Sequence, residues 1–457
     1  MGRLGVNVIK EGYRYNDVLF LSLDYEANAV CKLEGNFPVF VPLALKDEIG
    51  DIVIEKLYKN YAFGRLIRIS KKSPFRVEAK CEHFEECGGC NLMNLDYEAQ
   101  LAYKKELTMD TLKRVGGIIC QVNDTLTTNK IYNYRNKIEM PFGFRNKEVI
   151  AGFYKKKTHE LVNQNSCQIA PIEADEITSF LKSFFTFNKI PIYDEKRNTG
   201  SIKHIITRTT KLNETMIIIV SNTPSFPSMN NLVNELIERF PNTKSIVLNY
   251  NPGKTSLVMG KNNEVIYGND YILEEILGVK LKISASSFSQ VNTDAAELLY
   301  KKAIEYADLS GSEEVIDAYC GVGSISLCLA KKAKYVYGIE IVESAIKNAE
   351  ENKRINGITN VEFILGACEE KISFLAQSKN IDVIVFDPPR KGCDRKFIDT
   401  VINMKIKRIV YISCNIRTLA RDLSILKQDG YEIIKATPVD LFPNTSNIEN
   451  ICLLSLK

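Results

Sequence analysis

The sequence predicts a chain of several domains: a small N-terminal β-barrel, a central α+β domain and a C-terminal α/β domain with a parallel sheet. Its 457 residues correspond to about three domains at roughly 150 residues each. Short strand-like runs separated by Gly, Asn and Asp turns fill the first part, whereas strand and helix patterns alternate after about residue 286. We therefore expect domains at 1–75, 76–285 and 286–457.

Composition favours an ordinary soluble protein, and a cytoplasmic location is expected. Hydrophobic residues make up 45% of the chain and charged residues 25%. No apolar run approaches the ~20 residues needed to cross a bilayer, and residues 1–6 lead quickly into charged and turn residues, so neither a membrane span nor a signal peptide is expected. The net charge of +4 neither requires nor excludes a polyanionic partner, and the lysine run at 155–157 alone favours a solvated surface.

The first 75 residues contain strand-like runs at 18–23, 39–41, 52–56 and 63–70, a spacing typical of a small barrel. The passages at 37–45 and 50–53 resemble a TRAM domain, an OB-like barrel that holds RNA. This resemblance implies RNA binding by stacking and a basic groove, and a plain capping domain is the alternative. Asn28 lies where that family usually has glycine, and Asn tolerates positive φ.

The most specific local pattern is a group of three cysteines. Five residues separate Cys81 from Cys87, and two separate Cys87 from Cys90. Three thiolates close together need a cation, so a metal site is expected. Zinc would need a nearby fourth ligand, for which His83 is the candidate, whereas iron–sulfur clusters tolerate a distant fourth thiolate such as Cys167. Twelve cysteines in a cytosolic chain favour such chemistry, so we rank iron–sulfur above zinc and inert cysteines last.

The middle of the chain carries less chemistry. Helical periodicity runs over 97–114 and ends at Gly116 and Gly117. Aromatic and basic residues mix at 132–137, which suits RNA stacking and phosphate contact but equally suits the start of a strand. From 204 to 283, β-rich runs alternate with turns, which indicates a mixed α+β domain.

The C-terminal region begins with a cofactor-binding pattern. A strand at 314–318 leads into a tight turn with Gly321 and Gly323, and a second strand ends at Glu340, where a carboxylate can bind a ribose. A nicotinamide site fits this pattern in principle, but Ser326 replaces its third glycine. The order Asp317-x-x-x-Gly-x-Gly instead resembles S-adenosylmethionine-binding methyltransferases.

Two further loops limit the kinds of methylation that the sequence supports. In Asp387-Pro-Pro-Arg390, an arginine stands where amino-methyltransferases place an aromatic residue, which argues against exocyclic-amine methylation. RNA cytosine-5 methyltransferases would carry a cysteine in this loop and a second one after the next strand. Only the second is present, as Cys414 after the buried strand at 409–412. A buried, inert cysteine is the alternative there.

With the barrel and the cysteines, the motifs at 286–292, 314–323, 387–390, 413–415 and 438–443 resemble the RNA (uracil-5-)-methyltransferase family over almost the whole chain. The resemblance implies that S-adenosylmethionine binds to Gln290, Tyr319, Glu340 and Asp387. It implies Cys414 as nucleophile and Glu449 as general base, although Asn447 stands where the family commonly has His. It also implies a [4Fe–4S] cluster on Cys81, Cys87, Cys90 and Cys167.

The reaction needs a thiolate and a base around one ring. Attack at uracil C6 makes C5 nucleophilic, and a base must later remove the C5 proton. No histidine lies beyond residue 204, so the base is a carboxylate, Lys or Tyr. An ordinary thiol pKa of about 8.5 leaves little thiolate at neutral pH, and Arg390 and Arg417 are the nearest cations by motif.

We therefore expect a monomeric enzyme that forms 5-methyluridine in structured RNA, with no membrane partner. Ribosomal RNA is the first expectation and transfer RNA the second, because transfer-RNA members of the family generally lack the barrel and the cysteines. The alternative from another class is a catalytically silent RNA-binding iron–sulfur protein. The intact pair of Cys414 and Glu449 argues against that alternative.

Overall fold

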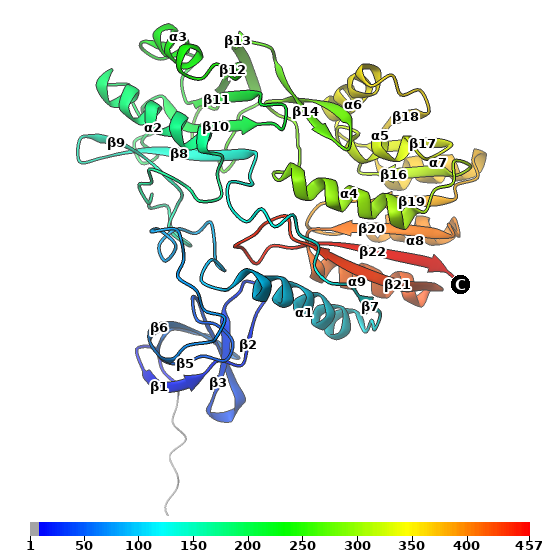
Figure 1. Cartoon of the computed structure of the whole chain (residues 1–457), viewed down its shortest axis with the longest axis horizontal. Coiled ribbons are helices and arrows are strands. Elements are labelled where there is room, and N and C mark those ends of the chain that lie inside the picture. Colours follow the sequence, from blue (N-terminus) through cyan, green and yellow to red (C-terminus); the bar gives the residue numbers. More distant parts are fainter. Residues whose placement is uncertain (1–8) are drawn as a thin grey trace, which may run out of the picture. The chain divides into compact units, whose positions relative to one another are not determined.

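The computed structural model describes residues 9–457 (Figure 1), so the expectation that no signal peptide occupies the first residues lies outside it. The chain forms two compact units. Among the described residues, the first comprises 9–107 together with 442–447, and the second comprises 108–441 with 448–457. The domain boundaries expected at 75 and 285 stay a prediction.

The first unit contains a six-stranded sheet in the order β1-β5-β6-β4-β3-β2. Its elements are β1 (Arg14–Leu19), β2 (Ser22–Leu23), β3 (Ala29–Leu33), the 3₁₀ helix η1 (Glu34–Asn36), β4 (Phe37–Val41), β5 (Ile49–Leu57) and β6 (Ala62–Lys71). Phe20, Val39, Val41, Ile52 and Ile54 are buried in its core. On β4 and β5, buried residues alternate with partly buried ones over 39–41 and 52–54, and the strands form the β-rich N-terminal domain that the short runs predicted.

The prediction that Asn28 replaces a glycine at positive φ is wrong. The left-handed backbone lies one residue earlier, at Ala27 with φ 59°. Asp24 explains the shift, because its carboxylate accepts hydrogen bonds from the backbone N–H of Asn28 (2.7 Å) and from the Asn28 side-chain amide (3.0 Å). This Asx-type turn forces the tight bend at Ala27.

A helix, α1 (Tyr97–Gly116), follows the cysteine loop and continues into the second unit. It confirms the periodicity over 97–114. The helix ends at Gly116, and Gly117 follows with φ 61°, a left-handed conformation that glycine adopts without strain.

The second unit contains a six-stranded sheet in the order β13-β12-β11-β10-β8-β9. Its elements are β8 (Lys137–Arg145), β9 (Glu148–Ala151), α2 (Ile172–Phe187), β10 (Ile202–Thr209), β11 (Thr215–Ser221), α3 (Met229–Arg239), β12 (Thr243–Tyr250) and β13 (Asn262–Gly268). Helices α2 and α3 share one apolar core with this sheet. A hairpin of β14 (Tyr271–Ile276) and β15 (Val279–Ser284) follows.

The same unit holds an eight-stranded sheet in the order β18-β17-β16-β19-β20-β22-β21-β7. Its elements are β7 (Gln121–Val122), α4 (Thr293–Ala307), β16 (Glu314–Ala318), α5 (Ser324–Ala330), β17 (Tyr335–Glu340), α6 (Glu343–Ile355), β18 (Val361–Leu365), α7 (Cys368–Ser378), β19 (Val383–Phe386), α8 (Arg395–Asn403), β20 (Arg408–Ser413), α9 (Ile416–Gln428), β21 (Tyr431–Val439) and β22 (Glu449–Leu456). Strands β16 to β20 run parallel, as the alternating pattern predicted. Among residues 9–457, no helix combines the length and the apolarity needed to span a membrane.

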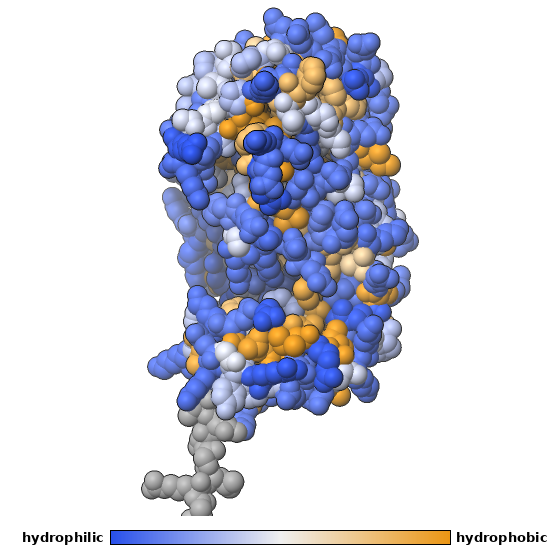
Figure 2. All heavy atoms as spheres, turned by 90° about the vertical axis from the view of Figure 1, so that its left-hand side faces the viewer, coloured by the Kyte–Doolittle hydropathy of each residue, from blue (hydrophilic) through white to orange (hydrophobic). Residues whose placement is uncertain are grey.

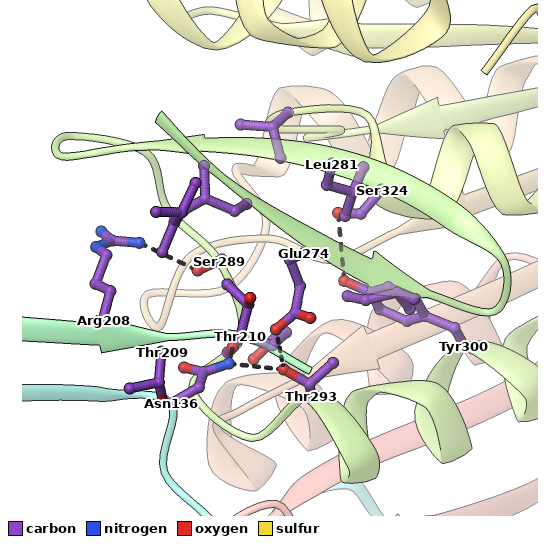
Figure 3. A pocket seen from close by; sticks show the side chains of 15 residues that line it. Asn136, Arg208, Thr209, Thr210, Glu274, Leu281, Ser289, Thr293, Tyr300 and Ser324 are labelled. Carbon is purple, nitrogen blue, oxygen red and sulfur yellow. Dashed lines mark hydrogen bonds between the residues drawn. The ribbon is translucent and has the colours of Figure 1, made fainter. Parts of the chain in front are cut away.

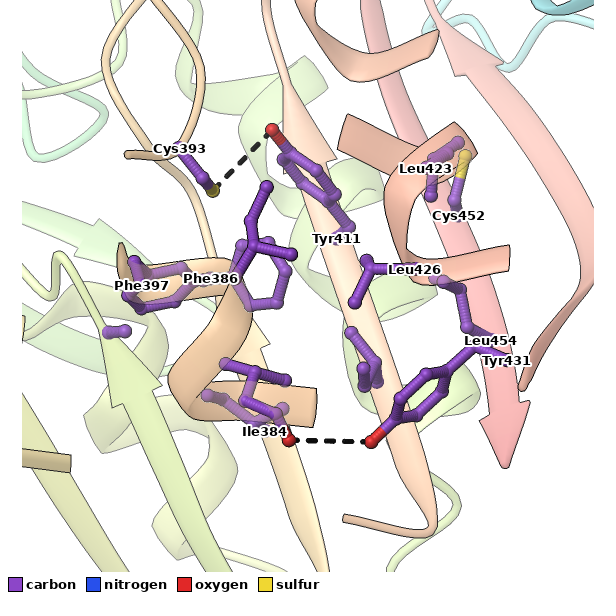
Figure 4. Packing of buried hydrophobic residues seen from close by; sticks show 14 of the residues in the cluster. Ile384, Phe386, Cys393, Phe397, Tyr411, Leu423, Leu426, Tyr431, Cys452 and Leu454 are labelled. Carbon is purple, nitrogen blue, oxygen red and sulfur yellow. Dashed lines mark hydrogen bonds between the residues drawn. The ribbon is translucent and has the colours of Figure 1, made fainter. Parts of the chain in front are cut away.

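Aromatic side chains fill the core beside the parallel strands (Figure 4). The ring of Phe386 lies 4.4 Å from that of Tyr411 and 5.2 Å from that of Phe397. The Tyr411 hydroxyl donates to the buried carboxylate of Asp422 (2.7 Å), so the polar group at this depth is satisfied. This packing holds the carboxyl ends of β19 and β20 in a fixed position.

Candidate active site

Cys414 lies between the end of β20 and the start of α9, and it is half-buried. Asn415 caps the helix, because its side-chain oxygen accepts from the backbone N–H of Arg417 (3.1 Å). The Asn415 side-chain amide also donates to the carbonyl of Arg390 (3.0 Å), which connects the loop at 387–390 to the residue after Cys414. The helix cap therefore holds both Cys414 and the loop that carries Arg390.

Glu449 and Cys414 lie at neighbouring ends of two paired strands. The antiparallel pair of β20 and β22 ends with Ser413 opposite Asn450, so Cys414 directly follows β20 and Glu449 is the first residue of β22. The side chain is well shielded, with Glu449 only 4% exposed. Burial raises the pKa of Glu449 well above its ordinary value, and the negative charge of Asp387 raises it further, whereas Arg390 lowers it.

The same neighbours act on the thiol. Burial, followed by the negative charges of Glu449 and Asp387, raises the pKa of Cys414 to about 11, and the Arg390 guanidinium opposes this shift. Of the two arginines that the sequence suggests, Arg390 is the one whose charge contributes to this pKa. In the free protein the thiol is protonated at neutral pH, so attack requires a proton acceptor or added positive charge.

The glycine turn after β16 supports the predicted cofactor site. Gly321 and Gly323 have φ values of 56° and 82°, and a Cβ at Gly323 would lie 2.6 Å from the Phe363 ring. Tyr319 also takes a left-handed conformation (φ 63°). The Glu340 carboxylate accepts from the backbone N–H groups of Gly321 (3.2 Å) and Val342 (2.9 Å), so it bridges the turn and the end of β17.

A buried carboxyl group lies beneath this turn. Asp317 is 1% exposed and accepts a hydrogen bond from the Ser326 hydroxyl. Burial raises the pKa of Asp317 to about 7. Ser326, which the sequence presents only as a missing glycine, therefore fixes the turn to α5. The sequence carries no signal for this contact, because only the fold brings the two residues together.

A residue on β10, in the six-stranded sheet of the second unit, holds the loop that carries Gln290 in place through hydrogen bonds (Figure 3). Arg208 on β10 donates to the Ser289 hydroxyl (3.3 Å) and to the carbonyls of Ala285 (3.3 Å) and Ser287 (2.6 Å). The side chain of Asn136 donates to the Gln290 carbonyl (2.9 Å). Sequence reasoning missed Arg208 entirely and placed Asn136 only within an aromatic and basic stretch.

The same side chain links this loop to helix α4. Asn136 donates to the Thr293 hydroxyl (2.8 Å), which in turn donates to the buried Glu274 carboxylate (2.6 Å). Gln290 lines a small cavity together with Tyr300 and Ser324 at the start of α5. The loop of Gln290 is thereby brought next to the glycine turn.

The structure thus gathers the predicted residues on loops that follow neighbouring strands. Asp387 follows β19, Cys414 follows β20, and Tyr319 and Glu340 lie at the ends of β16 and β17. In an open parallel sheet this carboxyl edge is where ligands bind. The edge therefore offers one thiol, one shielded carboxyl group and a glycine turn for a nucleoside cofactor.

The cysteine group lies in the other compact unit, on the loop between β6 and α1. Cys81 and Cys87 are half-buried, and the backbone N–H of Gly89 donates to the Cys87 sulfur (3.4 Å). Burial, with a contribution from the negative charge of Cys87, raises the pKa of Cys81. Thiol donors suit an iron–sulfur cluster. However, no group of three or more His, Cys, Asp or Glu side chains in residues 9–457 is arranged to hold a metal ion, so the cluster stays a prediction.

Comparisons with known proteins identify the family. Residues 254–457 match the model described as tRNA (Uracil-5-)-methyltransferase, and residues 13–67 match the TRAM domain, which confirms the predicted N-terminal barrel type. An uncharacterized RNA methyltransferase of Bacillus cereus (strain ATCC 10987 / NRS 248) is 42% identical over 97% of each chain, and one from Oceanobacillus iheyensis is 44% identical over 96% of each.

A solved structure is similar over the same length. The tRNA (uracil-54, C5)-methyltransferase of Pyrococcus abyssi, in complex with S-adenosyl-L-homocysteine, superposes with a TM-score of 0.77 at 26% identity. The similarity covers 97% of this chain and 100% of that one. The chain therefore belongs to the RNA (uracil-5-)-methyltransferase family, and it is an RNA methyltransferase.

Proposed function

We propose that the protein methylates C5 of uracil in RNA through a covalent adduct between Cys414 and C6. The observation that supports this proposal is that Cys414 and the shielded Glu449 adjoin the last residue pair of β20 and β22, where the negative charge of Glu449 acts on the thiol. A thiol and a carboxyl group facing one space are the two groups that this reaction requires.

The chemistry divides into three steps. The Cys414 thiolate forms a bond to C6, and the C5–C6 double bond gives an enolate with a nucleophilic C5. S-adenosylmethionine, when bound, supplies the methyl group for C5. Glu449 then removes the C5 proton, the C6–sulfur bond breaks, and the double bond and the free thiolate are restored.

Burial adapts Glu449 to this role. A raised pKa makes its carboxylate a better proton acceptor than an exposed one. Arg390 lowers the pKa values of both Glu449 and Cys414, so it favours the charged forms that the reaction uses. The target base must leave its stack to reach these groups, which suits loops or single-stranded RNA.

We assign S-adenosylmethionine binding to the loops around the glycine turn. The Glu340 carboxylate lies where it can accept from a ribose diol, and Gly321 and Gly323 allow close approach of the backbone. Tyr319, Gln290 and Asp387 complete the assignment on the same edge of the sheet.

A methylation assay tests the proposal. Protein, RNA and methyl-labelled S-adenosylmethionine should yield 5-methyluridine on nucleoside analysis. Cys414→Ala should abolish the product while cofactor binding persists, and Cys120→Ala, which removes another half-buried cysteine, should retain activity. Binding of RNA without any methyl transfer by the unaltered protein would instead support the catalytically silent alternative.

Ribosomal RNA is our proposed substrate and transfer RNA the second candidate. The first rests on the resemblance of the barrel and the cysteine group to ribosomal-RNA members of the family. The second is favoured by the similarity, over 97% of this chain, to a transfer-RNA enzyme. Mapping 5-methyluridine in both RNA classes from a strain lacking the protein distinguishes them, since only the true substrate loses its modification.

We further propose that Cys81, Cys87, Cys90 and Cys167 hold a [4Fe–4S] cluster. The support is the soft donor set and the spacing of the first three residues. Anaerobically purified protein should contain iron and acid-labile sulfide and should absorb broadly in the visible range. Cys87→Ser should lose both, and absence of iron from the unaltered protein would rule the cluster out.

A further inference from the structure

The second unit contains a groove that shares no lining residue with the candidate active site. It encloses about 990 Å³ and is lined by the β8–β9 hairpin and by residues from 154–161, 185–204 and 251–258. These segments surround one end of β10 in the six-stranded sheet. None of the chemistry proposed above uses this groove.

Positive charge dominates its lining. The basic residues are Lys147, Lys189, Lys196, Arg197, Lys203 and Lys254, against two carboxylates, Asp194 and Glu195. Asp194 is already engaged, because it accepts from the backbone N–H groups of Lys196 (2.9 Å) and Arg197 (3.2 Å). The lysine run at 155–157 lies in one of the lining segments, where Lys155 pairs with Glu160 (3.0 Å).

Three of these lysines are available to a ligand. Lys147, Lys189 and Lys254 are exposed, and no carboxylate within the described part of the chain lies within salt-bridge distance of them. Lys147 and Lys189 occupy turns with φ values of 67° and 53°. Their ammonium groups therefore present uncompensated charge at the rim of the groove.

Aromatic side chains accompany the charge. Phe144 is 64% exposed, although it follows Phe142, a buried residue on the same side of β8. Tyr154 and Tyr193 also line the groove, and the Tyr154 ring lies 5.8 Å from that of His159. Phe144 and the lysines line the same groove, and this combination suits a partner with flat faces and negative charge.

Lys203 connects two segments of the groove lining. The Lys203 ammonium donates to the carbonyls of Asn251 (2.7 Å) and Gly253 (2.6 Å) and lies 4.3 Å from the Tyr193 ring centre. This side chain therefore connects two lining segments before any ligand binds.

Figure 2 shows the side of the molecule on which β9 lies in Figure 1. Hydrophilic side chains predominate on this surface, and patches of hydrophobic side chains lie between them.

We propose that this groove binds a single-stranded segment of the substrate RNA, with phosphates at Lys147, Lys189 and Lys254 and a base stacked on Phe144. The assignment rests on the proposed function, because it names a second contact region for the same RNA. Stacking platforms next to basic side chains are how proteins hold single strands without reading their sequence. An acidic polypeptide would use the lysines but would leave Phe144 without a stacking partner.

The test measures binding of a fluorescent single-stranded oligouridylate to the full-length protein. The triple variant Lys147→Gln, Lys189→Gln, Lys254→Gln should bind more weakly, and the slope of log Kd against log salt should fall by about two, at roughly 0.7 for each lost phosphate contact. Phe144→Ala should weaken binding at least about fivefold with an unchanged salt slope.

A matched control removes the same charge elsewhere. Lys332, Lys405 and Lys407 are exposed lysines, and Lys405 shares the positive φ (51°) of the groove lysines. Their triple Gln variant should bind oligouridylate like the unaltered protein. Equal affinity and slope for the groove and control variants would overturn the assignment, as would a groove variant that loses polyglutamate binding but keeps RNA binding.

Failure of the proposed function would appear differently. It would show as no 5-methyluridine from the unaltered protein, whatever the groove variants bind. If both proposals hold, the groove variant should raise the KM for RNA and leave kcat at saturating RNA unchanged, because no groove residue belongs to the candidate active site.

Discussion

At the carboxyl end of β20, a thiol and a carboxyl group share one poorly solvated space. The negative charge of Glu449 raises the cost of ionising the Cys414 thiol, and Asp387 raises the cost of ionising both groups. Arg390 is the nearby cation that opposes this cost. The thiolate fraction of Cys414 in the free protein is therefore small at neutral pH.

This balance predicts how Cys414 reacts with iodoacetamide. Because its pKa is about 11, its alkylation rate should rise about tenfold per pH unit over roughly pH 8 to 10 without a plateau. Glu449→Gln should speed the reaction at a given pH, and Arg390→Gln should slow it. Mass spectrometry of the Cys414 peptide measures the rates, and shifts of the opposite sign would contradict these electrostatics.

Asp317 predicts a pH dependence of stability. Its pKa is raised from about 3.9 in the unfolded chain to about 7 in the fold, so its stabilising contribution is complete below about pH 4 and is lost as pH rises to about 7. Relative to Asp317→Asn, the unaltered protein should lose at most about 4 kcal/mol over this range. Chemical denaturation at several pH values measures this difference.

The control for that series is Asp399→Asn, at an exposed position on α8. It should change the free energy of unfolding by no more than about 0.5 kcal/mol at any pH. An Asp317→Asn curve parallel to that of the unaltered protein would contradict the shifted pKa.

At the residue scale, sequence motifs indicate the proposed reacting groups but not the residues that position the surrounding loops. Cys414 and Glu449 follow recognisable motifs, and the absence of histidine beyond 204 limits the base to few types. Arg208 and Ser326 have no such signal. The hydrogen-bond partners of Arg208 lie about 80 residues along the chain, and Ser326 reaches Asp317 only because the fold brings α5 next to the end of β16. The positive φ expected at Asn28 lies one residue earlier, at Ala27, because the side chain of Asp24 determines the turn.

Among the elements, the loop from 285 to 292 depends on a neighbouring sheet. Arg208 is 4% exposed, and burial lowers its pKa to about 10, yet three groups of this loop accept from it. Arg208→Met should leave these carbonyls unsatisfied, loosen the loop and raise the Kd for S-adenosylmethionine about tenfold or more. Calorimetric titration measures this, and Arg239→Met, an exposed arginine on α3, should bind normally.

The aromatic core predicts a larger effect on stability. Phe397 is fully buried and contacts Phe386 and, at 5.3 Å between ring centres, Tyr319. Phe397→Ala should cost roughly 3–5 kcal/mol of unfolding free energy, because it leaves a cavity. Phe374→Ala, at a position 68% exposed, should cost less than about 0.5 kcal/mol. Equal losses would contradict the packing.

Elements with a clear period were predictable, and short edge strands were not. The helix at 97–114 and the buried strand at 409–412 have apolar patterns that identify them. Strand β7 has only two residues and joins β21 at Gln121 and Val122, so its pairing depends on the sheet edge alone. The antiparallel entry of β22 between β20 and β21 is likewise set by topology, although it determines the position of Glu449.

Across the whole molecule, the chain combines a TRAM domain, a basic groove and a catalytic edge. The TRAM domain at 13–67 and the family model at 254–457 leave the groove region largely outside both matches. Sequence motifs could therefore identify the chemistry but not this surface, since its lysines come from three separate segments. RNA recognition distributed over several surfaces agrees with a net charge of only +4.

The central claim is that Cys414 and Glu449 act on one uracil ring in sequence. Glu449→Gln can neither remove the C5 proton nor release the ring, so incubation with RNA and S-adenosylmethionine should accumulate a methylated RNA–protein adduct. Mass spectrometry of the digested adduct should place the nucleotide on Cys414, and Cys414→Ala should give none. An adduct on another residue, or full turnover by Glu449→Gln without any adduct, would contradict the mechanism.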